Sequence, residues 1–235
     1  MENKRYDKYL KNKAALQKGI KKGERTQNRI KIATAKLLNE MSYNELRIVD
    51  ICKEAKIAPG TFYIYFENKT IVVVQVLSEF LDMYFEKIYQ IRSNDAYESI
   101  YFANKIFLEN TRANPGIVRC LFGMRTEHPE FSRVLCEANT KLYKKISRNV
   151  SSRDTGISYE MAYIAVHAMG SMMDEVVSRI AFDDTRHLNE VLEVLVMDDE
   201  AYCEYLSRIW YHTLYGKLPD KIRMDLTQEG QDATI

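Results

Sequence analysis

The 235 residues are enough to bury a substantial core, and 46% apolar and 29% charged residues with only nine Gly and four Pro exclude a fibrous, low-complexity or wholly disordered chain. The net charge of +1 hides an asymmetry, because residues 1–70 hold 16 Lys and Arg against 8 Asp and Glu. This basic first third favours nucleic acid or an anionic membrane as a partner, and the remainder of the chain is acidic.

The sequence shows no membrane or metal signature. No uncharged apolar stretch approaches the roughly 18 residues that cross a bilayer, and the start, MENKRYDKYLKNK, lacks the apolar segment of a signal peptide. The cysteines Cys52, Cys120, Cys136 and Cys203 form no CxxC pair, and no histidine lies at metal-ligand spacing. We therefore expect a cytoplasmic protein that has no metal site, no cofactor and no membrane partner.

The first elements follow from charge and spacing. Residues 1–22 are rich in lysine and poor in apolar residues, which predicts a basic arm, flexible or frayed-helical. A helix is expected over about 24–41, and a second helix of about nine residues follows the polar break at 42–45. Their apolar stripes are Ile30, Ala33, Leu37 and Met41 in the first helix and Ile48, Ile51, Cys52 and Ala55 in the second.

The segment IAPGTFYIYFENK, residues 57–69, predicts a tight turn and a very short helix. Pro59 suits a first helical turn, and Gly60 keeps that turn slim enough to approach another surface closely. Phe62 and Phe66 are four residues apart and are expected in the core, which leaves Thr61, Tyr63, Ile64 and Tyr65 to project partly outward. A helix this short is not stable alone, so its exposed aromatics indicate a helix-turn-helix whose second helix enters the major groove of DNA.

Over residues 24–72 the sequence resembles the DNA-binding signature of the TetR family of bacterial transcriptional regulators. The residues that carry this resemblance are Asp50-Ile51, Ala55, Ile57, Gly60-Thr61-Phe62-Tyr63, Tyr65-Phe66 and Lys69. Three positions depart from the family pattern. Arg47 replaces a Thr cap, Lys56 replaces a turn glycine, and Ala58-Pro59 replaces Ser-Lys.

The resemblance implies which residues contact DNA. The N-terminal end of the short helix would face base edges or adjacent phosphates, and basic or aromatic residues around it would hold the phosphate backbone. The implied set is Arg47, Pro59, Gly60, Thr61, Tyr63, Tyr65 and Lys69. A core position remains the alternative for Tyr63 and Tyr65, and Arg25, Arg29 and the lysine arm could add phosphate contacts or simply be solvated.

The rest of the chain keeps a helical pattern and shows no strand-period segment. Helices are expected over about 69–92, 96–113, 115–122, 129–149, 158–182 and 199–215, with Asp95 and Glu98 as a capping box. The predicted fold is all-α, with an N-terminal three-helix helix-turn-helix domain followed by a helical ligand-binding and dimerisation bundle. The expected organisation is a basic flexible arm (1–22), a DNA-binding domain (23–68), a ligand-binding and dimerisation domain (69–218) and a tail (219–235).

The uncharged run MAYIAVHAMGSMM, residues 161–173, is too apolar for a surface helix and too short for a membrane span. Its small residues would let another helix approach closely. In the TetR family the two C-terminal helices of each subunit form the dimer interface, so the resemblance places Ala165, Ala168, Gly170, Ser171 and Trp210 there. An ordinary core helix of a monomer is the alternative.

A ligand cavity between the middle helices would be lined by aromatic and Met residues, although such stripes at helical spacing are more often plain core. The candidate set is Phe80, Met83, Tyr84, Phe102, Phe107, Phe122, Met124, Tyr143, Tyr163, His167 and Met172. His167 is the most conspicuous polar group of the uncharged run, with a satisfied core histidine as the alternative. The 16 Tyr and 10 Met favour a moderately hydrophobic effector.

Together these features predict a ligand-responsive transcriptional regulator. The expected form is a homodimeric repressor of a palindromic double-stranded DNA operator, released by a small, moderately hydrophobic inducer. A corepressor, which would strengthen DNA binding instead of weakening it, would need only the opposite sign of the coupling between ligand binding and DNA binding. The alternative function is a helical adaptor that binds a protein or an anionic membrane surface through its basic arm. An enzyme is not expected, since the sequence brings no acid, base and nucleophile together.

Overall fold

The computed structural model describes residues 4–17, 19–124, 126–153, 156–195, 197–217 and 219. Within these residues the chain forms eleven α-helices and no strand, so the predicted all-α class is confirmed. None of these helices is both long and apolar enough to cross a bilayer. The predicted tail lies outside the described residues except for Pro219, and so does Lys18 of the predicted arm.

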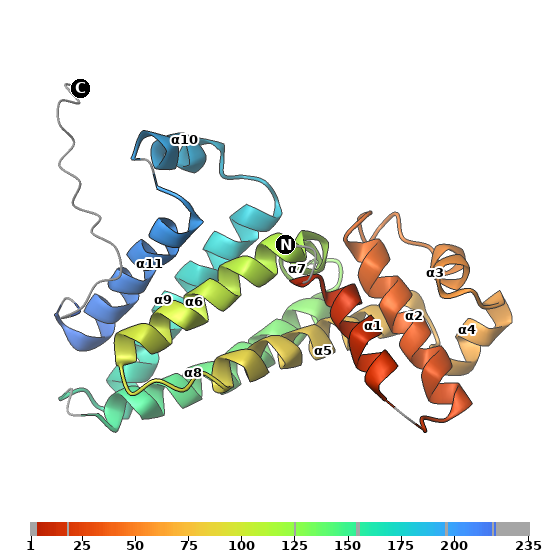
Figure 1. The fold of residues 1–235 in the computed structure, drawn as a ribbon, viewed down its shortest axis with the longest axis horizontal. Coiled ribbons are helices and arrows are strands. Elements are labelled where there is room, and N and C mark those ends of the chain that lie inside the picture. Colours follow the sequence, from red (N-terminus) through yellow and green to blue (C-terminus); the bar gives the residue numbers. More distant parts are fainter. Residues whose placement is uncertain are drawn as a thin grey trace.

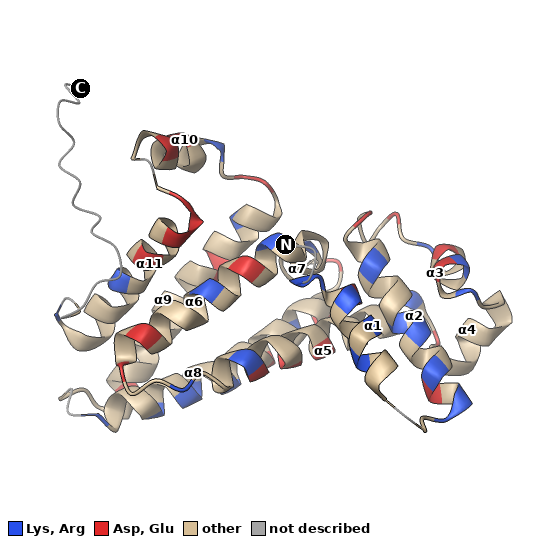
Figure 2. Ribbon diagram, viewed as in Figure 1, with Lys and Arg blue, Asp and Glu red and all other residues tan. Residues whose placement is uncertain are grey.

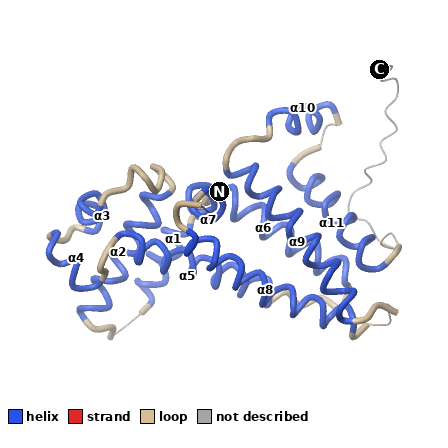
Figure 3. The backbone as a smooth tube through the Cα atoms, turned by 180° about the vertical axis from the view of Figure 1, so that it is seen from behind, coloured by secondary structure: helices blue, strands red, loops and turns tan. Residues whose placement is uncertain are grey.

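The helices form two groups joined by one long helix (Figure 1; Figure 3 shows the same arrangement from behind). In chain order they are α1 (Tyr6–Leu16), α2 (Lys22–Leu38), α3 (Ile48–Ala55), α4 (Pro59–Tyr65), α5 (Lys69–Tyr89), α6 (Ala96–Ala113), α7 (Pro115–Gly123), α8 (Pro129–Ser151), α9 (Tyr159–Ala181), α10 (Arg186–Val194) and α11 (Asp199–Tyr215). Helices α1 to α4 form one end of the molecule, and α5 leads from them into a bundle, where it packs along α8.

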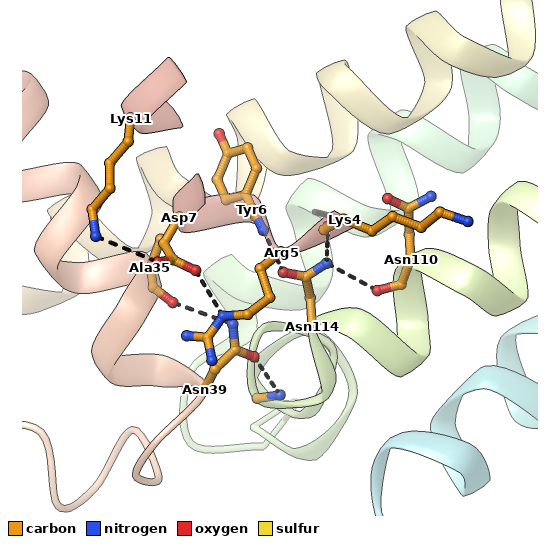
Figure 4. Close-up of polar contacts among 10 residues, drawn as sticks. Lys4, Arg5, Tyr6, Asp7, Lys11, Ala35, Asn39, Asn110 and Asn114 are labelled. Atoms are coloured by element: carbon orange, nitrogen blue, oxygen red, sulfur yellow. Dashed lines mark hydrogen bonds and ion pairs between the residues drawn. The ribbon is translucent and has the colours of Figure 1, made fainter. Parts of the chain in front are cut away.

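Helix α1 corrects the predicted flexible arm, because residues 6–16 form a packed helix. Tyr6 is 1% exposed and its ring lies edge-on to that of Phe80, with 5.3 Å between the ring centroids. Leu10, one turn later, is also buried. The buried carboxylate of Asp7 is paired with Arg5 at 2.9 Å and faces Lys11 at 3.8 Å (Figure 4). The lysines occupy the other face, so the helix is amphipathic despite its charge.

Side-chain caps fix where several helices begin. Asn68 Oδ1 accepts a hydrogen bond from the Ile71 N–H at 3.0 Å and starts α5. Asp95 Oδ1 accepts from the Glu98 N–H at 3.0 Å, which confirms the Asp95 half of the predicted capping box of α6, whereas the Asp95 N–H donates to Ser93 Oγ at 3.1 Å. The helix expected over 199–215 has the same bounds in the structure, whereas α10 was not predicted at all.

Two glycines allow the closest helix approaches. A Cβ atom at Gly116, at the start of α7, would lie 1.8 Å from the Leu38 carbonyl oxygen of α2. A Cβ atom at Gly170 of α9 would lie 2.2 Å from the Tyr143 hydroxyl oxygen of α8. The first contact joins the group of α1 to α4 to the bundle, and the second holds the bundle itself together.

Candidate DNA-binding surface and effector pocket

Helix α4 presents one face to the core and one to solvent. Phe62 and Phe66 are buried, at 0% and 3% exposure, as the sequence predicts. Tyr63 is 58% exposed and Ile64 74%, so the core alternative for Tyr63 is excluded. Pro59 occupies the first turn, and a Cβ atom at Gly60 would meet nothing within 4 Å. The outward face therefore begins with a flat, open backbone surface.

Thr61 and Tyr65 are half-buried. The Tyr65 hydroxyl oxygen would lie 3.4 Å from a Cβ atom at Gly23, so the ring covers the N-terminal turn of α2. This contact fixes the angle between α4 and α2. Tyr65 thus has a packing role, while the side of α4 that carries Tyr63 remains open.

The turn between α3 and α4 carries backbone strain. Lys56 has φ 53° and ψ 51°, the left-handed conformation that a glycine adopts at no steric cost. The Arg29 guanidinium donates to the Ala55 carbonyl and, at 2.7 Å, to the Lys56 carbonyl. Arg29 therefore caps the C-terminal end of α3, which replaces the phosphate contact considered for it.

The structure also corrects the role expected of Lys69. Its ammonium donates to the carbonyls of Tyr43 and Leu46, both at 2.8 Å, and lies 4.2 Å from the centroid of the Tyr43 ring. Burial lowers the pKa of Lys69. The side chain ties the loop before α3 to the start of α5, so this geometry does not support the expected phosphate contact.

Arg47 lies at the surface, at the start of α3. Its backbone N–H donates to Asp50 Oδ2 at 3.2 Å, so Asp50 supplies the acceptor that the third helical residue provides in a capping box. Lys and Arg are frequent on α1 and α2, and Arg47 and Lys56 flank α3, whereas α4 carries no charge (Figure 2). The uncharged α4 thus lies on a domain whose other helices carry basic residues. In such an arrangement the basic residues contact phosphates and position the protein, and the uncharged helix contacts the bases that specify the sequence.

The bundle contains a pocket of about 320 Å³ at the end far from α4. It is bounded by the C-terminal ends of α5, α8 and α11, the first half of α6 and the middle of α9. Its lining is mainly apolar, with Arg92, Lys145 and Arg153 among its charged residues. The Lys145 ammonium lies 3.8 Å from the centroid of the Tyr89 ring, and burial and the nearby Arg92 lower the pKa of Lys145.

A second chamber of about 30 Å³ lies in the bundle interior. Phe107 and Tyr143 of the predicted ligand set line the large pocket, and Phe107 also lines the small chamber. Phe80, Tyr84 and Phe122 line the small chamber alone.

The other residues of the predicted ligand set line neither cavity. These are Met83, Phe102, Met124, Tyr163, His167 and Met172. Phe102 is 37% exposed, and His167 is exposed on α9 rather than held in a core. Both side chains lie on outward helix faces. Helical spacing in the sequence groups residues on one face, but it does not say whether that face points into the bundle or out to solvent.

The residues predicted for the dimer interface divide into two groups. Ala168 and Ser171 are exposed and Ala165 is half-buried on α9. Gly170 and Trp210 are instead buried within the chain, and both line the large pocket. The prediction for these two is wrong, because Gly170 admits the Tyr143 ring of the same chain rather than a partner helix.

Comparison with known proteins agrees with this geometry. Residues 32–76 match the profile of bacterial regulatory proteins of the tetR family. A segment of 58 residues is 36% identical to the uncharacterized HTH-type transcriptional regulator YuxN of Bacillus subtilis, covering 25% of this chain and 20% of that protein. The match thus spans about a fifth of this curated relative.

Solved structures share the fold over most of their length. A TetR transcription regulator from Haloarcula marismortui has a TM-score of 0.63 at 16% identity, covering 83% of this chain and all of that one (100%). FadR from Bacillus subtilis in complex with stearoyl-CoA has a TM-score of 0.55 at 17% identity, covering 81% and 98%. At these identities the likeness establishes the fold alone.

The helix-turn-helix with its exposed α4, set on an all-helical bundle, has the geometry in which a short helix enters the major groove of DNA. Over residues 32–76 the chain is thus similar to the bacterial regulatory proteins of the tetR family. Among the described residues, no group of three or more His, Cys, Asp or Glu is placed to hold a metal ion.

Proposed function

We propose that the protein is a homodimeric repressor that binds a palindromic operator and is released by a small, moderately hydrophobic inducer. The observation that carries the proposal is the exposed face of α4, where Tyr63 and the open backbone at Gly60 lie on a helix that packs against the basic helix α2. The match of residues 32–76 to the tetR-family profile disfavours the adaptor alternative, because an adaptor leaves the exposed face of α4 unexplained.

Base contact is assigned to the N-terminal part of α4. Pro59, Gly60 and Tyr63 are exposed and Thr61 is half-buried beside them. Arg47, at the start of α3, is exposed and available to a phosphate. A helix of seven residues reads few bases, so selectivity requires two copies on half-sites about 34–36 Å apart or a multiple of that spacing.

The outer face of α9 supports the homodimer. Met161 and Ile164 are 62% and 63% exposed, and Ala168 and Ser171 continue the same face. Tyr205 of α11 is 51% exposed. Large exposed apolar side chains on two helices suit a self-complementary interface. Ile164→Glu is expected to yield monomers in analytical ultracentrifugation, and Phe102→Glu, on an exposed part of α6, serves as the control.

The effector would occupy the large pocket. Its volume lies at the lower end of the roughly 300–1,000 Å³ of small-molecule sites. The fold shared with a stearoyl-CoA complex is consistent with a hydrophobic effector. Ile88 and Tyr89, which end α5, line the pocket, while the other end of α5 follows α4 after three residues, 66–68. A ligand that displaces the distal end of this stiff helix would reorient α4.

Release requires the inducer to favour the DNA-incompetent arrangement, because equal affinity for both arrangements shifts nothing. The experiment is a duplex-binding titration across salt concentrations, with duplexes first selected from a random pool. A regulator retains one preferred palindrome at every salt concentration. An adaptor with a basic arm would lose binding steeply with salt and show no preferred sequence.

A further inference from the structure

The small chamber of the bundle contains two unsatisfied polar groups. The Tyr84 hydroxyl and Asn110 Oδ1 have no hydrogen-bond partner among the described residues. Tyr84 is 5% exposed and Asn110 4%, and both line the chamber of about 30 Å³. Buried polar groups in folded proteins are almost always paired, so this pair indicates a missing partner.

The two groups differ in kind. The Asn110 amide nitrogen donates to the Ile106 carbonyl at 2.7 Å, which leaves its oxygen as an acceptor facing no donor. Burial and the negative charge of Asp174 raise the pKa of Tyr84 well above its ordinary value, so its hydroxyl remains a donor. The chamber thus offers one donor and one acceptor, the complement of a single hydroxyl group.

The chamber adjoins the large pocket. Phe107 and Asp174 line both cavities, and the Phe107 ring lies edge-on to Tyr84 with 4.6 Å between centroids. A shift of the Phe107 ring would open the small chamber to a molecule in the large one. The void has about the volume of one water molecule, so one small polar group fits there.

We propose that the effector is a compact apolar molecule with one neutral hydroxyl group, a phenol or an alcohol, that enters the small chamber. The apolar body fills the large pocket; the hydroxyl oxygen accepts from the Tyr84 hydroxyl, and the hydroxyl hydrogen is donated to Asn110 Oδ1. The proposal rests on the proposed function of the pocket. The Asp174 carboxylate in the shared wall disfavours an anionic group, and an ether oxygen could not donate to Asn110.

This placement links the effector to the DNA-binding end. Tyr84 belongs to α5, and the Asn110 carbonyl accepts from Asn114 Nδ2 at 3.0 Å. Asn114 Oδ1 in turn accepts from the Tyr6 N–H of α1 at 2.7 Å. A hydroxyl held between Tyr84 and Asn110 would bridge α5 and α6, which both contact the end of the molecule that carries α4.

The test measures affinity directly, with 4-butylphenol, 4-butylanisole and butylbenzene titrated into the full chain by calorimetry. Trp210, the one tryptophan of the sequence, lines the large pocket and gives an independent fluorescence signal. The phenol is expected to bind about five- to tenfold more tightly than the other two probes. Tyr84→Phe should reduce that preference, because only the bond to Asn110 remains, whereas the control Tyr163→Phe, whose residue lines neither cavity, should leave it unchanged.

Equal affinities for the three probes, no binding of any probe, or a preference that Tyr84→Phe leaves undiminished would each overturn the proposal. Tighter binding of 4-butylbenzoate than of the phenol would do the same. These titrations contain no DNA, so they fail or succeed independently of operator recognition. A protein that shows the phenol preference and no operator would refute the proposed function alone.

Discussion

The side-chain oxygen of Asn39, at the end of α2, accepts a hydrogen bond of 3.0 Å from the backbone N–H of Gly116, at the start of α7 (Figure 4). Beside it the fully buried Asn114 accepts from the Tyr6 N–H and donates to the carbonyls of Lys4, at 3.2 Å, and Asn110. The joint between α6 and α7 is therefore bonded to both α1 and α2. Because α6 lines the pocket, a movement of α6 would be transmitted through these hydrogen bonds to α1 and α2.

Gly116→Ala is expected to lower the free energy of unfolding by about 1–3 kcal/mol, because the added methyl would overlap the backbone of Leu38 and Asn39. The measurement is urea unfolding followed by circular dichroism. An unchanged urea midpoint would contradict the close approach of α7 to α2.

Gly60→Ala provides a contrasting glycine. Nothing lies within 4 Å of a Cβ atom there, and alanine is favoured over glycine in a helix by roughly 0.5–1 kcal/mol, so we expect slightly higher stability. Operator affinity should nevertheless fall, because the methyl would separate α4 from the DNA. Undiminished operator affinity would remove Gly60 from the proposed contact surface.

Lys56→Gly should raise the free energy of unfolding by up to about 1 kcal/mol. The left-handed conformation costs a residue with a Cβ atom roughly 1–2 kcal/mol, and the flexibility of glycine in the unfolded chain offsets part of the gain. The control, Lys53→Gly within α3, should destabilise by about 1 kcal/mol. Thermal unfolding of both variants checks the sign, and a loss of stability in Lys56→Gly would refute the strain argument.

Local sequence signals predicted the helices better than they predicted which parts of the chain each helix contacts. The cap at Asp95 marks a helix start that the structure reproduces, because a cap depends on residues within one turn. The packing of helix α1 was missed because its lysines outnumber Tyr6 and Leu10, which form its apolar face. Helix α10, whose exposed apolar face includes Val194, gave no signal that was recognised.

The pocket shows where prediction from sequence stops. A small residue at 170 was correctly taken to admit a close neighbour, but that neighbour is Tyr143 of the same chain. Phe107 was correctly predicted to line the pocket, whereas Trp210, which also lines it, was assigned to the dimer interface. Helical spacing shows which residues share a face, but it does not show which part of the molecule that face contacts. The unsatisfied Tyr84 hydroxyl depends on the absence of a tertiary partner, which no sequence pattern records.

The central claim is that the exposed face of α4 reads a DNA sequence. Fluorescence anisotropy with the selected duplex and a scrambled duplex, at several salt concentrations, tests it directly on the wild type, Tyr63→Ala and the control Val194→Ala, which lies on α10. We expect Tyr63→Ala to lose about 1–3 kcal/mol of affinity for the selected duplex alone, with an unchanged salt slope, and Val194→Ala to match the wild type. Equal wild-type affinity for both duplexes, or full affinity in Tyr63→Ala, would contradict the account.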